Sequence, residues 1–137
     1  MWRVTRPAVA RYLMRALELQ ARGDVEPELV VNEDADQVNL EHILPKSAKT
    51  AEWPGFSTDH QRANVHRVGN LCLLQKGPNG RIGNKDWASK RPILAASLLQ
   101  LTSEAAAYQD WTPKTIEKRQ EDLAALAVKT CPRSPWP

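Results

Sequence analysis

The spacing of hydrophobic positions along the chain predicts two long amphipathic helices. Between residues 8 and 22, apolar side chains recur every three or four positions, with Pro7 at the start and Gly23 after the end. A second stripe of the same period covers residues 113–128, where Pro113 takes the first helical position. One helix is therefore expected near each end of the chain.

Shorter helical patterns lie between the second strand and the last helix. We expect helices over residues 79–90, 92–99 and 103–110, the last of them with Ser103 as its N-cap. The tail, residues 129–137, is rich in proline and is expected to be irregular.

Alternating apolar and polar residues predict a half-buried strand at residues 38–43. In a regular strand, Glu41 and His42 point to opposite faces. They meet at one point only if the strand breaks there, and Pro45 with the loop behind it is the expected break.

The segment from residue 46 to residue 67 has no sustained period and is read as a long irregular loop. A second strand is expected at 68–74, followed by a turn rich in glycine and proline. The whole chain is expected to form a single α+β domain, mostly helical, around one hairpin.

Composition narrows the class of protein. The chain has 137 residues, 42% of them hydrophobic, which is enough for the core of one domain. It lacks an apolar run of membrane-spanning length and the apolar stretch of a secretory signal, so we expect a cytoplasmic protein. Its two cysteines, Cys72 and Cys131, lie far apart, which disfavours a disulfide framework or a zinc cluster.

Charge is unevenly distributed along the chain. The net charge is +3, but eight acidic residues gather between Asp24 and Glu52, and basic residues dominate the segments on either side. Carboxylates hold divalent cations, and Arg and Lys hold phosphates, so this pattern suits a metal-dependent enzyme acting on a polyanion. It is equally compatible with ordinary solvated surfaces of mixed charge.

The most informative pattern is an ordered set of residues around the two strands. It comprises Glu41-His42-Ile43-Leu44-Pro45, Gly69-Asn70-Leu71 and Asn79. The set resembles the HNH, or ββα-metal (His-Me finger), nuclease motif. That resemblance implies a hairpin-helix core over about residues 38–90, surrounded by amphipathic helices at 8–22 and 92–128.

The resemblance extends to the nuclease domain at the C-terminus of GmrSD-type restriction enzymes. Further residues that carry it are His66-Arg67-Val68, Asn84, Trp87, Lys90, and Trp111, Ile116 and Arg119 in the spacing W-x4-I-x2-R. It covers nearly the whole chain, and it implies restriction of phage or modified DNA with a 5′-phosphate and a 3′-hydroxyl as products. The NTPase-like domain that usually accompanies such nucleases is expected on a partner chain or domain.

Residue chemistry assigns the roles within this motif. His42 is the expected general base, because imidazole titrates near neutrality and accepts a proton from water. Glu41 and Asn79 are the expected ligands of one Mg²⁺ or Mn²⁺ ion, with Asn84 as the competitor of Asn79. Asn70 is expected to tie the loop after His42 to the second strand and so to orient the imidazole.

Several basic residues are candidates for contacts to the DNA backbone. Arg67, Lys85, Lys90 and Arg91 are expected to face phosphates, although single basic residues are more often solvated surface charges. His66 has three interpretations: a cation on a phosphate, a hydrogen-bond partner within the site, and an ordinary loop residue, which is favoured.

Aromatic residues are read mainly as packing. Trp87, Trp111 and Trp136 are expected in the core, and Trp53 is expected to anchor the long loop rather than to touch DNA. The alternative to a nuclease is a non-catalytic module that binds nucleic acid or protein within a larger complex.

Overall fold

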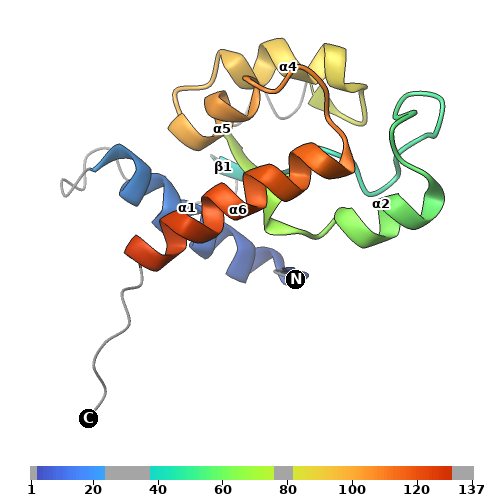
Figure 1. Ribbon diagram of the computed structural model, residues 1–137. Coiled ribbons are helices and arrows are strands. Elements are labelled where there is room, and N and C mark those ends of the chain that lie inside the picture. Colours follow the sequence, from blue (N-terminus) through green and yellow to red (C-terminus); the bar gives the residue numbers. More distant parts are fainter. Residues whose placement is uncertain (1–2, 24–37, 76–81, 131–137) are drawn as a thin grey trace.

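A computed structural model of the protein describes residues 3–23, 38–75 and 82–130 (Figure 1). The elements follow one another as α1 (Pro7–Arg22), β1 (Val38–His42), α2 (Thr58–Asn64), the 3₁₀ turn η2 (Val68–Asn70), β2 (Leu71–Gln75), α4 (Trp87–Ala95), α5 (Gln100–Ala105) and α6 (Pro113–Thr130).

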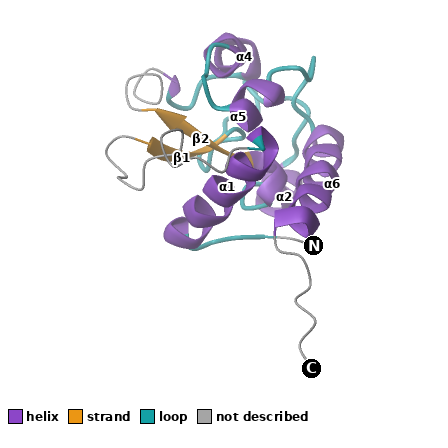
Figure 2. Ribbon diagram, turned by 90° about the vertical axis from the view of Figure 1, so that its left-hand side faces the viewer, coloured by secondary structure: helices purple, strands orange, loops and turns teal. Residues whose placement is uncertain are grey.

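The architecture is α+β and mostly helical, as the sequence predicted. β1 and β2 form a two-stranded antiparallel sheet in which Glu41 lies opposite Cys72 and His42 opposite Leu71. Figure 2 shows α4 on one side of this sheet and α1 on the other. The arrangement is compatible with a small ββα domain.

Successive side chains of β2 point to opposite faces of the sheet, and both faces are buried. Cys72 and Leu74 pack on the side of α4, whereas Leu71 and Leu73 pack on the side of α1. The core is thus divided into two clusters, and α6 contributes Ile116 to the first and Leu123 to the second. A sheet covered on both faces has a tightly specified register.

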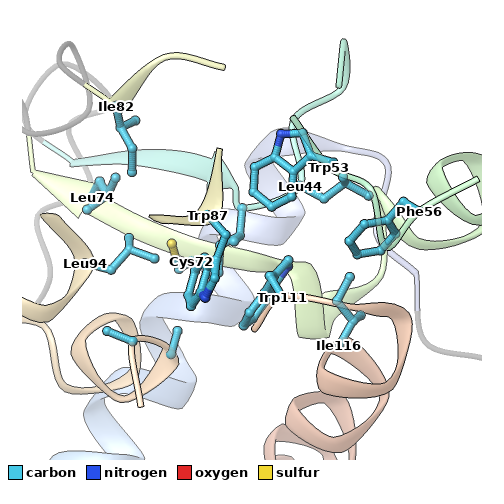
Figure 3. Close-up of a cluster of buried hydrophobic side chains, with 13 residues drawn as sticks. Leu44, Trp53, Phe56, Cys72, Leu74, Ile82, Trp87, Leu94, Trp111 and Ile116 are labelled. Carbon is cyan, nitrogen blue, oxygen red and sulfur yellow. The ribbon is translucent and has the colours of Figure 1, made fainter. Parts of the chain in front are cut away.

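The cluster on the α4 side holds most of the aromatic residues (Figure 3). The rings of Trp87 and Trp111 stack with centroids 4.9 Å apart, and both are buried as expected. Trp53 and Phe56, from the segment after β1, are 2% and 0% exposed. Trp53 therefore anchors this segment to the core, as predicted, while Trp136 lies outside the described residues.

The two long helices were predicted closely. α1 ends at Gly23, whose φ of +66° is the left-handed conformation that glycine adopts without strain. α6 begins at Pro113 and continues to Thr130, two residues further than its apolar stripe indicated. In the described part of the chain, none of the helices has the length and apolarity that a membrane crossing requires.

The helix expected over residues 79–90 is interrupted in its described part. Gly83 has a φ of +49°, which interrupts helical geometry, and α4 starts only at Trp87, where the Asp86 side chain caps the Ser89 amide at 2.9 Å. Pro92 lies inside α4 rather than at the start of a separate helix. The region from 76 to 81 lies outside the described residues.

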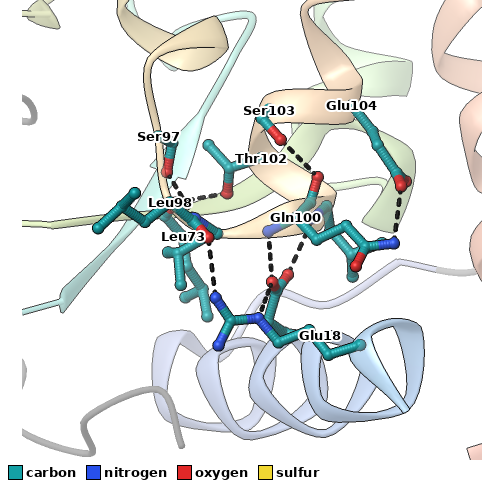
Figure 4. A network of polar contacts seen from close by, with 11 residues as sticks. Glu18, Leu73, Ser97, Leu98, Gln100, Thr102, Ser103 and Glu104 are labelled. Carbon is teal, nitrogen blue, oxygen red and sulfur yellow. Dashed lines mark hydrogen bonds and ion pairs between the residues drawn. The ribbon is translucent and has the colours of Figure 1, made fainter. Parts of the chain in front are cut away.

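The helix expected at 103–110 is also shifted. α5 spans Gln100–Ala105, and Ser103 lies inside it instead of capping it. The cap comes from another helix: the buried Glu18 carboxylate of α1 accepts the amide hydrogens of Gln100 and Leu101 (Figure 4). A contact between distant segments, which no local pattern encodes, thus sets where α5 begins.

The segment between the strands is less irregular than its sequence suggested. It contains α2, whose first turn is capped by the Ser57 hydroxyl at 3.1 Å from the His60 amide. The second strand starts at Leu71 rather than at residue 68, because Val68–Asn70 form a 3₁₀ turn against α6. A Cβ at Gly69 would lie 2.2 Å from the Ile116 carbonyl oxygen, so only glycine allows this approach.

Candidate active site

His42 is the last residue of β1, and its half-buried imidazole lies beside a second histidine. The rings of His42 and His66 meet edge to face with centroids 5.4 Å apart. We call these two residues the histidine pair. The structure therefore brings together two side chains that are 24 positions apart in the sequence, while the role of His66 stays a prediction.

Backbone pairing holds His66 in this position. The Val4 amide donates to the His66 carbonyl oxygen at 3.0 Å, and Arg3 forms an isolated β-bridge with Arg67. The N-terminal segment before α1 thus runs beside residues 66–67 and carries Arg3 to the site. Within the described part of the chain, the buried Nδ1 atom of His66 has no hydrogen-bond partner.

The surroundings of the histidine pair disfavour positive charge on the rings. Burial lowers the pKa of His42 to about 4, and the charges of Lys46, His66 and Lys90 act in the same direction. Burial, Lys46 and Arg3 likewise lower the pKa of His66. Both imidazoles are therefore neutral at pH 7, which leaves a nitrogen lone pair on each ring able to accept a proton.

Glu41 lies on the other face of the hairpin. β1 is regular through His42 and the chain bends at Ile43 and Leu44, so the side chains of Glu41 and His42 leave the strand on different faces. Burial raises the pKa of the Glu41 carboxyl group, while the nearby Lys90 ammonium group opposes this shift. Convergence of Glu41 and His42 on one phosphate stays a prediction.

The Lys90 side chain extends from α4 to the Glu41 carboxylate of β1. Its Nζ atom donates to Glu41 Oε1 at 2.8 Å, to the His42 carbonyl oxygen at 3.1 Å and to the Ile43 carbonyl oxygen at 2.8 Å. We call these three acceptors the oxygen cradle. The Lys90 side chain is 0% exposed, so the expectation that it contacts a phosphate on the surface does not hold for this arrangement.

Asn70 ties the segment after His42 to the sheet. Its Oδ1 atom accepts from the Leu44 amide at 2.8 Å and from the Trp111 indole at 3.0 Å. Its Nδ2 atom donates to the carbonyl oxygens of Leu44 and Val65, each at 3.0 Å. All four bonds lie around a fully buried side chain, which fixes the bend that follows His42; a part for Asn70 in the chemistry stays a prediction.

The other predicted DNA contacts lie in different environments. Arg67 is 5% exposed and is paired with Glu117 of α6 and with Asn64, so it is not placed to face a phosphate either. Arg91 is half-buried, and its Nε atom donates to the Ala106 carbonyl oxygen at 2.8 Å. Lys85 is exposed in the segment before α4.

The predicted amide ligand is not placed by the structure. Asn79 lies outside the described residues, and its competitor Asn84 is exposed in the turn before α4. Among the described residues, no group of three or more His, Cys, Asp or Glu side chains is close enough to hold a metal ion.

Two features of the site escaped the sequence reasoning. The burial of Lys90 had a signal, because Lys90 stands three residues after Trp87 and four before Leu94, on the apolar stripe of α4. The approach of Arg3 to the histidine pair had no such signal in the sequence, since it depends on backbone pairing between distant segments.

The sequence model of the C-terminal domain of GmrSD restriction endonucleases matches residues 2–126 of this chain. The chain belongs to that family. A search of curated proteins found no match. Membership in the GmrSD C-terminal family implies a nuclease domain of a restriction endonuclease, with DNA as its substrate. Nucleases of this type generally use a divalent metal.

In this GmrSD C-terminal domain, the oxygen cradle places three oxygen atoms around one positive charge. One carboxylate and two carbonyl oxygens are the donor types that Mg²⁺ and Mn²⁺ prefer. The cradle already surrounds a cation, the Lys90 ammonium group. The oxygen atoms of the cradle are therefore of the type that binds the divalent metal implied by the family.

Proposed function

We propose that this domain hydrolyses DNA phosphodiester bonds and that His42 is the general base. The observation that carries the proposal is the position of the His42 imidazole, which is neutral, half-buried and beside His66 at the end of β1. Family membership supports the nuclease activity, and the site supports the choice of base.

In the proposed step, a ring nitrogen of His42 takes a proton from water while the water oxygen attacks phosphorus. The bond from phosphorus to the 3′-oxygen breaks, and solvent protonates that oxygen, giving a 3′-hydroxyl and a 5′-phosphate. A bound phosphate brings negative charge, which counteracts the effect of the Lys46 and Lys90 charges on His42 and raises its pKa in the complex. The substrate thus makes His42 a stronger base than it is in the free protein.

Cations near the histidine pair are proposed to hold the DNA backbone. Arg3 and Lys46 join Lys85 and Arg91 in this role, and the neutral His66 is proposed to contact a phosphate through its ring N–H. The pairing of Lys90 and Arg67 within the protein removes these two residues from the set. Positive side chains facing phosphates release counterions, which favours binding.

Metal dependence with a single ion is part of the same proposal. Glu41 and Asn79 are its proposed ligands, with Asn84 as the alternative to Asn79. When bound, the ion neutralises charge that develops on the phosphate and the leaving oxygen. Mg²⁺ and Mn²⁺ are the ions considered, and the biological role is proposed to be restriction of foreign DNA in the cytoplasm with an NTPase-like partner.

A plasmid-nicking assay tests the proposed activity. Purified protein is expected to convert supercoiled plasmid to the nicked form with Mg²⁺ or Mn²⁺, and to stop when EDTA is added. The nicks should be sealed by DNA ligase, because ligation needs a 5′-phosphate next to a 3′-hydroxyl. DNA binding without any cleavage, unchanged by EDTA, would instead indicate a non-catalytic binding module.

A further inference from the structure

A fully buried lysine is the feature of the molecule that the proposed chemistry does not use. Lysine is almost never completely buried unless its charge is paired. Here each of the three oxygens of the cradle lies 2.8 to 3.1 Å from Nζ, and Nζ lies 5.7 Å from the centre of the Trp53 ring. The ammonium group thus occupies a site built for a cation.

The carboxylate in this site is the one proposed to bind metal. Glu41 Oε1 already accepts a hydrogen bond from Lys90, so a divalent ion at Glu41 must share the carboxylate with the ammonium group or displace it. Two positive charges a few ångströms apart repel each other strongly in a partly buried site. The more strongly the Lys90 ammonium group binds to Glu41, the more weakly a divalent ion can therefore bind there.

We propose that the Lys90 ammonium group competes with the divalent metal for Glu41 and thereby sets the metal affinity of the site. The inference rests on the proposed role of Glu41 as a metal ligand. Lys90 is a positioning residue in this account: it keeps the carboxylate and the end of β1 in place when no metal is bound, and it makes metal binding weak.

Titration with Mn²⁺, followed by the loss of the free-ion signal in electron paramagnetic resonance spectra, measures this competition without DNA. We expect Lys90→Ala to bind Mn²⁺ at least about tenfold more tightly than the wild-type protein, because the repelling charge is gone. Work at pH 8 favours the ionised form of the Glu41 carboxyl group, whose pKa is raised by burial. The same gain should appear as an Mn²⁺-dependent rise in the unfolding temperature, because a ligand that binds the folded state stabilises it.

Three further variants separate the causes. Lys114→Ala removes an exposed lysine of α6 that has no part in the proposed site and should leave Mn²⁺ binding unchanged. The double variant Glu41→Gln with Lys90→Ala should lose the gain. Lys90→Met removes the charge but keeps a long unbranched side chain at this buried position, so it tests the competition if the alanine variant fails to fold.

The competition is refuted if neither Lys90 variant binds Mn²⁺ more tightly than the wild-type protein, or if the gain survives Glu41→Gln. A purely structural lysine would lower stability and leave the affinity unimproved. Because the titration contains no DNA, its result is independent of whether the protein nicks plasmid. A protein that gains Mn²⁺ affinity but never cleaves DNA would overturn the proposed function and leave the competition intact.

Discussion

At the scale of single residues, Asn70 carries the most hydrogen bonds of any side chain beside the site. Asn70→Ala leaves the Leu44 amide and the Trp111 indole without their acceptor in a buried environment. We expect the free energy of unfolding to fall by about 3 kcal/mol, since each unsatisfied buried group costs about 1–3 kcal/mol. Urea denaturation measures the loss, and Asn84→Ala, at an exposed position, should show almost none. Equal losses in the two variants would contradict the buried network.

The histidine pair makes stability depend on pH. His42 has a pKa of about 4 in the folded protein and an ordinary value of 6.5 when unfolded. Between these values the unfolded chain binds more protons, so stability is fully present above pH 6.5 and is lost as the pH falls towards 4. His66 shifts in the same direction.

We therefore expect His42→Gln to flatten the dependence of the unfolding free energy on pH between about 4 and 6.5. Urea denaturation at several pH values across this window is the measurement. An identical slope in the variant and the wild-type protein would show that the surroundings of His42 do not disfavour its charged form.

At the scale of elements, the start of α5 depends on α1. Glu18 is 2% exposed, accepts two amide hydrogens of α5 and is paired with Arg22 at 3.2 Å. Glu18→Ala should destabilise the protein by about 1–2 kcal/mol, the usual effect of losing a helix cap. Glu104→Ala removes only an exposed partner of Gln100 (Figure 4) and is the matched control. A larger effect from Glu104 would contradict the role given to Glu18.

Elements with strong local signals were predictable, and those positioned by distant contacts were not. α1 and α6 each have a proline at the start and a sustained apolar stripe, and β1 has apolar and polar residues that alternate from Val38 to Glu41. The bounds of α4 and α5 were wrong, because Gly83 interrupts one and Glu18 caps the other. Proline and serine were read as start signals in places where tertiary contacts decide.

The same division applies to the site. The sequence predicted that Asn70 joins the loop after His42 to the second strand, because the motif order places it there, and the structure has these bonds. Lys90 lies on the apolar stripe of α4, which indicates burial, but from the sequence it was interpreted as a surface charge. The meeting of His42 and His66 depends on backbone pairing with residues 3 and 4, which no local pattern predicts.

At the scale of the whole molecule, the sheet separates two chemical environments. On the α4 side, Glu41 is neutralised by Lys90 in the aromatic cluster, whereas on the other side the histidine pair lies next to Arg3 and Lys46. The side chains of Glu41 and His42 thus leave the hairpin on different faces. In this account the histidine side activates water, and the Glu41 side determines how tightly metal binds.

The most direct test of this account is the rate of DNA cleavage by His42→Ala, compared with that of His60→Ala. His60 is an exposed histidine on α2 and has no part in the proposed site. With folding checked by circular dichroism, His42→Ala should lose about 10²–10⁴-fold in single-turnover rate, the usual contribution of a general base. His60→Ala should cleave as fast as the wild-type protein. Equal rates in all three proteins would contradict the assignment of His42 as the base.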